Sequence, residues 1–241
     1  MEDEYLDQLS EDVQALVAEI EQKAELEIEI EVDPSRAKGL PDQPDPLACV
    51  IDEFGVRILL PKADQFPEGA VLHELLHARR FLVEGIPQIA VCDDHWNDKL
   101  EQSYTALDNS LEHMIVVADE LARRPDRRSR WVSTVERALT RVEAGKLPEI
   151  DRDITALLVF ALSKHVLGNG ALLGRAEALL DRLGLRLRAA KYFADLVPSL
   201  ASKEKMTAVS FSHFGLSKET ACFHYIDARE HEVREVSLSK V

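Results

Sequence analysis

The stretch "LACVIDEFGVRILLPKADQFPEGAVLHELLHARRFLV" (residues 47–83) decides the fold. Apolar runs on either side of the turn letters "DEFG" predict a β-hairpin with strands at 48–51 and 56–60. Pro67 then stands where a helix begins, because a first helical turn does not need the N–H that proline lacks. The apolar spacing that follows predicts a helix over about residues 67–83. The sequence therefore places a small sheet directly before a helix.

Upstream of this hairpin, two further elements are predicted. Apolar residues recur every three or four positions over residues 4–24, as in an amphipathic helix. Residues 25–32, "ELEIEIEV", alternate strictly, so the apolar side chains should face a core and the glutamates solvent. We interpret the glutamate row as a solvated sheet face and not as a cation site, because carboxylates along a lone strand do not converge on an ion. Prolines and a glycine predict a loop over residues 33–46.

Downstream, the pattern is mainly helical. Helices are expected over residues 99–123, 130–144, 153–167, 172–183 and 187–196. Two strands, at 207–216 and 220–230, are expected to pair as a C-terminal hairpin. The predicted fold class is α+β: a small antiparallel sheet packed on the helix of residues 67–83, a mostly helical body and the C-terminal β-hairpin.

No clear linker divides the chain, and we therefore expect one domain over residues 1–241. Its expected parts are an acidic N-terminal helix and strand (1–46), a core around the helix of residues 67–83 (47–123), a helical part (124–200) and the C-terminal hairpin (201–241).

Composition and charge limit the classes of function. The chain has 241 residues, 46% of them hydrophobic, which is enough for a sizeable core. Its net charge is −15, and residues 1–46 carry 15 acidic and 3 basic side chains, a net −12 of that total. A general affinity for nucleic acid is not expected, because binding to phosphates needs a positive field. The acidic segment would suit a basic protein partner.

The sequence favours a cytoplasmic protein that does not associate with a membrane. No apolar run reaches the roughly 18 to 20 residues that span a bilayer. The start, "MEDEYLDQLSEDVQ", is acidic, whereas a secretory signal has a basic start and an apolar middle. Three cysteines (Cys49, Cys92 and Cys222) are far apart and odd in number, as expected of free thiols in a reducing compartment.

The letters "HELLH" within the helix of residues 67–83 carry the chemistry. His73 and His77 stand four apart, so a helix places both imidazoles on one face, where they can bind one metal ion. Glu74 follows about 100° further round and can hold a water bound to that ion. The alternative is an ordinary amphipathic helix with two surface histidines and an ion-pairing glutamate.

A catalytic zinc needs a third protein ligand and one open position. In the helix expected over residues 99–123, Asp108 and Glu112 lie on the flank of the apolar stripe, whereas His113 falls on the far side. We choose Glu112 as the third ligand, because its longer side chain can reach inward. Asp108, one turn earlier, would hydrogen-bond a zinc-bound histidine. Asp108 and His113 are the alternative ligands.

With "HELLH" followed on a later helix by a glutamate, the chain resembles the zincin metallopeptidases, specifically the gluzincin arrangement of two histidines and one glutamate. The resemblance covers roughly residues 45–122. It implies a small sheet packed on the motif helix, one zinc ion per chain held by His73, His77 and Glu112, and Glu74 as the general base. The extended pattern HExxHxxGxxH of the metzincins is absent.

Such peptidases often use a histidine, tyrosine or arginine to steady the oxyanion. His224 and Tyr225 in the last predicted strand are the candidates, with His213 and Tyr104 as further ones. We therefore expect a zinc-dependent endopeptidase that hydrolyses an intracellular protein or peptide substrate. The alternative is a non-catalytic protein of zincin fold that acts as a binding or regulatory module through protein–protein interaction.

Overall fold

The structure is a computed structural model that describes residues 1–35, 47–64 and 66–240. The chain forms two compact units. The first, called the sheet unit, comprises residues 1–88 and 223–236. The second, called the helical unit, comprises residues 89–222 and the residues from Ser237 on. The expectation of one domain stays a prediction.

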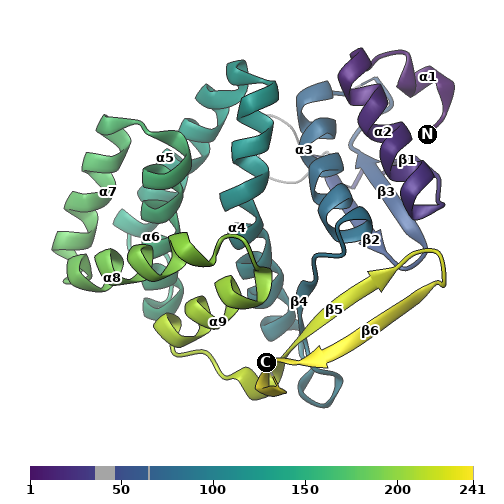
Figure 1. Cartoon of the computed structure of the whole chain (residues 1–241). Coiled ribbons are helices and arrows are strands. Elements are labelled where there is room, and N and C mark those ends of the chain that lie inside the picture. The colour runs from purple at the N-terminus through teal and green to yellow at the C-terminus, as the bar shows by residue number, and fades with distance from the viewer. Residues whose placement is uncertain (36–46, 65, 241) are drawn as a thin grey trace. The chain divides into compact units, whose positions relative to one another are not determined.

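The sheet unit begins with two helices and a three-stranded sheet. Its elements are α1 (Asp3–Leu6), α2 (Glu11–Ala24), β1 (Ile28–Val32), β2 (Ala48–Asp52), β3 (Gly55–Leu60) and α3 (Glu68–Ala78), which a π-helix (Arg79–Val83) continues. The sheet order is β1-β3-β2, with β1 parallel and β2 antiparallel to the central β3. Helix α3 packs on β2 and β3 (Figure 1).

The core between this sheet and α3 follows from the apolar run of β3, which is buried at nearly every position, and from the apolar spacing of the helix. Ile58 and Leu60 of β3 are fully buried, and so are Val71, Leu72 and Leu75 of α3. Burying a side chain of this size removes apolar surface from water, and each one stabilises the folded state by about 1.5–3 kcal/mol. The predicted hairpin and motif helix are therefore confirmed.

The N-terminal elements agree with their patterns except at two boundaries. The single helix predicted over residues 4–24 is two helices, α1 and α2. Strand β1 starts at Ile28, later than predicted, because Glu25 ends α2 in the left-handed conformation. The glutamates of β1 face solvent and Ile28 is buried, as predicted, but Val32 at the end of the strand is 41% exposed, so the predicted burial is wrong at that position. Most of the loop predicted over 33–46, residues 36–46, lies outside the described residues.

The helical unit contains most of the α-structure. Its helices are α4 (Asp98–Arg123), α5 (Arg128–Glu143), α6 (Glu149–Leu162) with a π-helix (Ser163–Leu167), α7 (Gly170–Arg182), α8 (Arg186–Leu196) and α9 (Lys203–Phe214). Short 3-10 turns are at Asp93–His95, Pro125–Arg127, Val197–Ser199, Lys218–Thr220 and Leu238–Lys240. The five helices predicted between residues 99 and 196 are confirmed.

The C-terminal hairpin is present but uses other strands than predicted. It consists of β5 (Ala221–Asp227) and β6 (Glu232–Ser237). The strand predicted over residues 207–216 is wrong, because those residues belong mainly to α9 and the turn after it. The side chains buried in this stretch follow helical spacing: Thr207, Ser210, Phe211 and Phe214. The alternation of apolar and polar residues over the same stretch favoured a strand instead.

A short strand, β4 (Gln88–Val91), was not predicted. It belongs to a second sheet of order β4-β5-β6. Beside it in the helical unit, the N–H of Cys92 donates to the carbonyl of Thr220 at 3.1 Å, just before β5. The predicted α+β class is confirmed. Within the described residues, no helix is both long and apolar enough to cross a membrane.

Candidate metal centre

The motif helix α3 brings its two histidines together. His73 Nε2 and His77 Nε2 are 3.2 Å apart, and the ring centroids are 4.8 Å apart with the rings nearly perpendicular. Two nitrogens at the usual 2.0–2.1 Å from a tetrahedral zinc ion are separated by about 3.3–3.4 Å. The observed separation therefore fits a pair of imidazoles that share one ion.

Burial also suits a ligand role for this pair. Only 5% of His77 is exposed, and His73 is partly exposed. The neighbouring side chains of Leu72, Leu75 and Leu76 on α3 are buried as well. Neutral imidazole is the form that binds metal.

At the end of α3, the helix changes type and its first residue beyond the end, Arg79, forms ion pairs. His77 lies in the last turn of α3, directly before the π-helix of residues 79–83. Arg79 contacts Glu84 at 2.8 Å (Nη1 to Oε1) and Glu19 of α2 at 3.3 Å (Nε to Oε2). The contact with Glu19 joins the end of the motif helix to α2. Single π-turns are frequent at functional sites.

Glu74 lies near a thiol that the sequence did not single out. Burial raises the pKa of Cys49 well above its usual value, and the negative charges of Glu74 and Asp52 raise that pKa further. Cys49 is in β2 and partly buried. The charge of Glu74 therefore affects a side chain of the edge strand β2. Only the packing of α3 on the hairpin reveals which residue of β2 this is.

Asp108 and Glu112 form a buried ion cluster with a lysine of α9. The ammonium Nζ of Lys203 is 2.6 Å from Asp108 Oδ1 and 2.8 Å from Glu112 Oε1. Asp108 Oδ1 also accepts the backbone N–H of Ile89 at 2.9 Å. Glu112 is fully buried and Lys203 is 1% exposed. We call these three side chains the Lys203 cluster.

In the Lys203 cluster, two carboxylates share one ammonium. Burial raises the pKa of Asp108, and the nearby charge of Glu112 raises it too, whereas Lys203 and the hydrogen bond from Ile89 lower it. The net direction is upward, because removal from water opposes ionisation and one lysine serves two acids. Sequence analysis missed Lys203, which lies on the helix mistaken in part for a strand and far from α4 in the sequence.

His113, the other alternative ligand, lies on α4 beside an indole ring. The centroids of His113 and Trp131 are 4.9 Å apart and their planes differ by 70°. Trp131 Nε1 donates to Glu120 Oε2 at 2.9 Å, and Arg127 Nε is 2.6 Å from Glu120 Oε1. The basic turn after α4 thus includes an arginine that neutralises a buried carboxylate.

The candidates for an oxyanion donor each have a partner. His224 Nε2 of β5 is 3.7 Å from Glu235 Oε2 of β6, and Arg234 of β6 lies over the ring of Tyr225, 4.3 Å from its centroid. Of the further candidates, His213 pairs with Asp195 at 2.8 Å and Tyr104 with Thr220 at 2.6 Å. A role for any of them at the oxyanion stays a prediction.

The predicted ligands lie in different units. The structure brings His73 and His77 together on α3 of the sheet unit, with Glu74 between them in sequence. Asp108, Glu112 and His113 are on α4 of the helical unit, and the closure of the site by one of them stays a prediction. In comparisons with known proteins, the chain matches no family model, no curated protein and no solved structure.

Proposed function

We propose that this protein is a zinc-dependent endopeptidase. The observation that carries the proposal is the 3.2 Å separation of His73 Nε2 and His77 Nε2 on a largely buried helix, next to Glu74. Two further facts support it. The histidine pair is part of an HExxH sequence, and α3 packs on a small sheet as the resemblance to zincins implies.

His73 and His77 would hold the ion through their Nε2 atoms. When bound, zinc lowers the pKa of a water molecule towards neutrality and polarises a carbonyl group. Glu74 would take the proton of that water on its carboxylate and pass it to the leaving amine. A carboxylate suits this task because a carboxyl group ordinarily has a pKa below neutrality. It is therefore deprotonated at the start of the reaction, and it is deprotonated again once the proton has passed to the amine.

Glu112 remains the proposed third ligand, with Asp108 and His113 as alternatives. A carboxylate has two oxygens, and Lys203 contacts Oε1 of Glu112. The protein would act in the cytoplasm on a protein or peptide substrate, and residues 1–46 would bind a basic partner.

The first experiment measures metal content. Protein purified in the presence of zinc is dialysed, and zinc is counted by elemental analysis. We expect about one zinc per chain, and none in the double variant His73→Ala, His77→Ala. His165→Ala, which removes an exposed histidine of the helical unit, is the matched control and should keep its zinc. Equal zinc in the double variant and in wild type would contradict the proposal.

The second experiment separates an enzyme from a binding module. Wild type and Glu74→Gln are incubated with a proteome, and new peptide termini are identified by mass spectrometry. We expect Glu74→Gln to bind zinc like wild type but to produce at least about a hundredfold fewer cleavages, which is the size of a general-base contribution. Zinc binding without cleavage by wild type would favour the non-catalytic zincin-fold module instead.

A further inference from the structure

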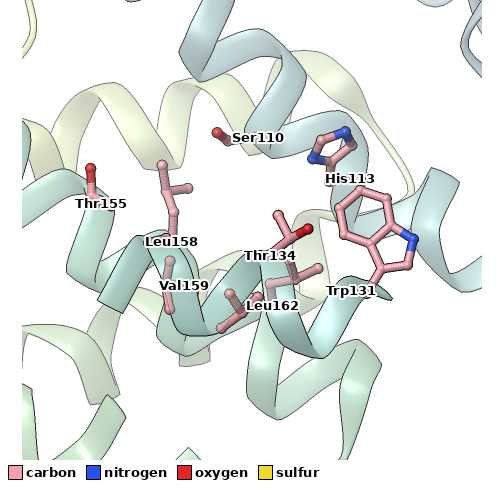
Figure 2. Close-up of a pocket in the computed structure, with 10 residues that line it drawn as sticks. Ser110, His113, Trp131, Thr134, Thr155, Leu158, Val159 and Leu162 are labelled. Carbon is pink, nitrogen blue, oxygen red and sulfur yellow. The ribbon is translucent and has the colours of Figure 1, made fainter. Parts of the chain in front are cut away.

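A half-open pocket, called the cavity below, lies in the helical unit between α4, α5 and α6 (Figure 2). Its volume is about 180 Å³. A single water needs roughly 10–15 Å³ of such space, so the cavity exceeds a water site more than tenfold. It is lined by Ser110, His113, Trp131, Thr134, Val135, Ala138, Thr155, Leu158, Val159 and Leu162.

Polarity divides the lining of this cavity into a floor and a rim. Leu158, Val159 and Leu162 of α6 are each 8% exposed and form an apolar floor. The hydroxyl-bearing residues Ser110 and Thr155 are more exposed. A ligand would therefore enter past hydroxyl groups and bury an apolar body beneath them.

The walls are held in place by contacts outside the cavity. Trp131 donates its indole N–H to Glu120, which leaves the ring surface to line the cavity. Ser110 Oγ donates to the carbonyl of Ala106 at 2.7 Å, and Thr134 Oγ1 accepts from Arg137 Nη2 at 3.1 Å. Rigid walls reduce the conformational entropy lost on binding.

The chemistry of the lining selects the class of ligand. None of the lining residues is an aspartate, glutamate, lysine or arginine. A charged ligand would lose its hydration without gaining a partner of opposite charge. The hydroxyls of Ser110, Thr134 and Thr155 can each make a hydrogen bond to a neutral polar group, in addition to the bonds that Ser110 and Thr134 already make. His113 and Trp131 present their rings edge to face, which suits contact with an apolar or aromatic body.

We propose that this cavity binds a small neutral molecule with an aromatic or branched aliphatic body and one hydroxyl or carbonyl group. Its size would be at most roughly 12 to 18 non-hydrogen atoms, because about 180 Å³ divided by roughly 10–15 Å³ per water-sized position gives that number of positions. The site contains neither His73, Glu74 nor His77, but it includes His113, an alternative zinc ligand, so zinc content is measured alongside ligand binding.

The probe for the test is 2-naphthol, a neutral aromatic alcohol, and naphthalene-2-sulfonate is its anionic counterpart. Binding to the full chain is measured by isothermal titration calorimetry and by saturation-transfer NMR. We expect 2-naphthol to bind at least tenfold more tightly than the sulfonate. Equal binding of both probes would overturn the proposed ligand class, and no binding of 2-naphthol at millimolar concentration would overturn the site.

Variants locate the binding. Ala138→Leu fills the cavity from α5 and should weaken 2-naphthol at least tenfold. Ala144→Leu, an exposed position at the end of the same helix, is the matched control and should bind like wild type. Undiminished binding to Ala138→Leu would place the probe elsewhere and overturn the proposal.

Two further readouts guard against ambiguous results. If Ala138→Leu does not fold, the binding site is located by the amide chemical-shift changes that 2-naphthol causes in wild type. The largest changes must then lie in α4, α5 and α6, and changes centred elsewhere would overturn the proposal. If sedimentation shows a dimer that Ala138→Leu disrupts, the occupant is a second copy of the chain and the small-molecule proposal fails. Zinc content should be the same in every variant, so failure here and failure of the metal site are distinguishable.

Discussion

Replacing Lys203 by methionine should destabilise the protein strongly. The change removes the ammonium that lies 2.6 Å from Asp108 and 2.8 Å from Glu112 but keeps most of the aliphatic volume. Glu112 is fully buried, so one uncompensated carboxylate, or two, would remain away from water. Breaking a buried ion pair in this way costs about 3–5 kcal/mol. For a chain of this size, that loss lowers Tm by roughly 6–20 °C.

The assay is urea unfolding followed by circular dichroism, with Tm measured in parallel. Lys205→Met is the matched control, because Lys205 lies two residues further on α9 and is exposed. It should change the free energy of unfolding by less than about 0.5 kcal/mol. A loss in Lys203→Met no larger than that of Lys205→Met would refute the reasoning.

A compensating variant tests the cause. Adding Asp108→Asn and Glu112→Gln to Lys203→Met removes all charge from the Lys203 cluster. The amide oxygen introduced by Asp108→Asn can still accept the N–H of Ile89, which the carboxylate of Asp108 accepts at 2.9 Å in wild type. We expect the triple variant to recover at least half of the lost stability, because neutral groups are less costly to bury than unpaired ions. No recovery would show that packing, and not charge, causes the loss.

Three further predictions use the other buried groups. The pKa of Asp108 is raised on folding, so its contribution to stability is fully present below its unfolded value of 3.8 and is lost as pH rises through the folded value. The stability of wild type relative to Asp108→Asn should thus increase as pH falls from 7 towards 4 in urea unfolding, and a decrease would contradict this. In metal-free protein, Glu74→Gln should lower the pKa of Cys49, because it removes a nearby negative charge. Alkylation of Cys49 by iodoacetamide at pH 8, measured by mass spectrometry, should then be faster. An unchanged or slower rate would argue against the interaction between Glu74 and Cys49. Glu120→Leu leaves Arg127 and the indole of Trp131 without their carboxylate, and it should lower the free energy of unfolding in urea by about 3 kcal/mol. The control Asp119→Leu, at an exposed neighbouring position, should lower it little. Equal losses in the two variants would refute the role of Glu120.

The sequence predicted elements well where one periodicity dominated. The apolar run of β3 beside its turn and the apolar spacing of α3 each extend over several residues, and both elements are confirmed. The prediction failed at residues 207–216, where alternating apolar letters also fit a helix with Phe211 and Phe214 inward. Strand β4 was missed because four residues are too few to establish a period.

The candidate site was predictable in its local part only. His73 and His77 are neighbours because one helical turn separates them, and no other part of the chain is needed to bring their nitrogens together. Cys49 and Lys203 were not predictable as neighbours of Glu74 and Glu112. Each of these contacts joins separate elements, and one sequence contains no direct signal for such a pairing.

The sequence by itself therefore determined the α+β class, the hairpin followed by α3, and the pair of imidazoles on one helical face. Those features depend on periodicity, which is a property of a short stretch of chain. Only the tertiary structure decided that the glutamate expected to bind zinc is fully buried with Lys203. The physical reason is that burial and ion pairing depend on which elements pack together. A carboxylate on the flank of α4 looks the same in sequence whether α9 presents a lysine to it or solvent does.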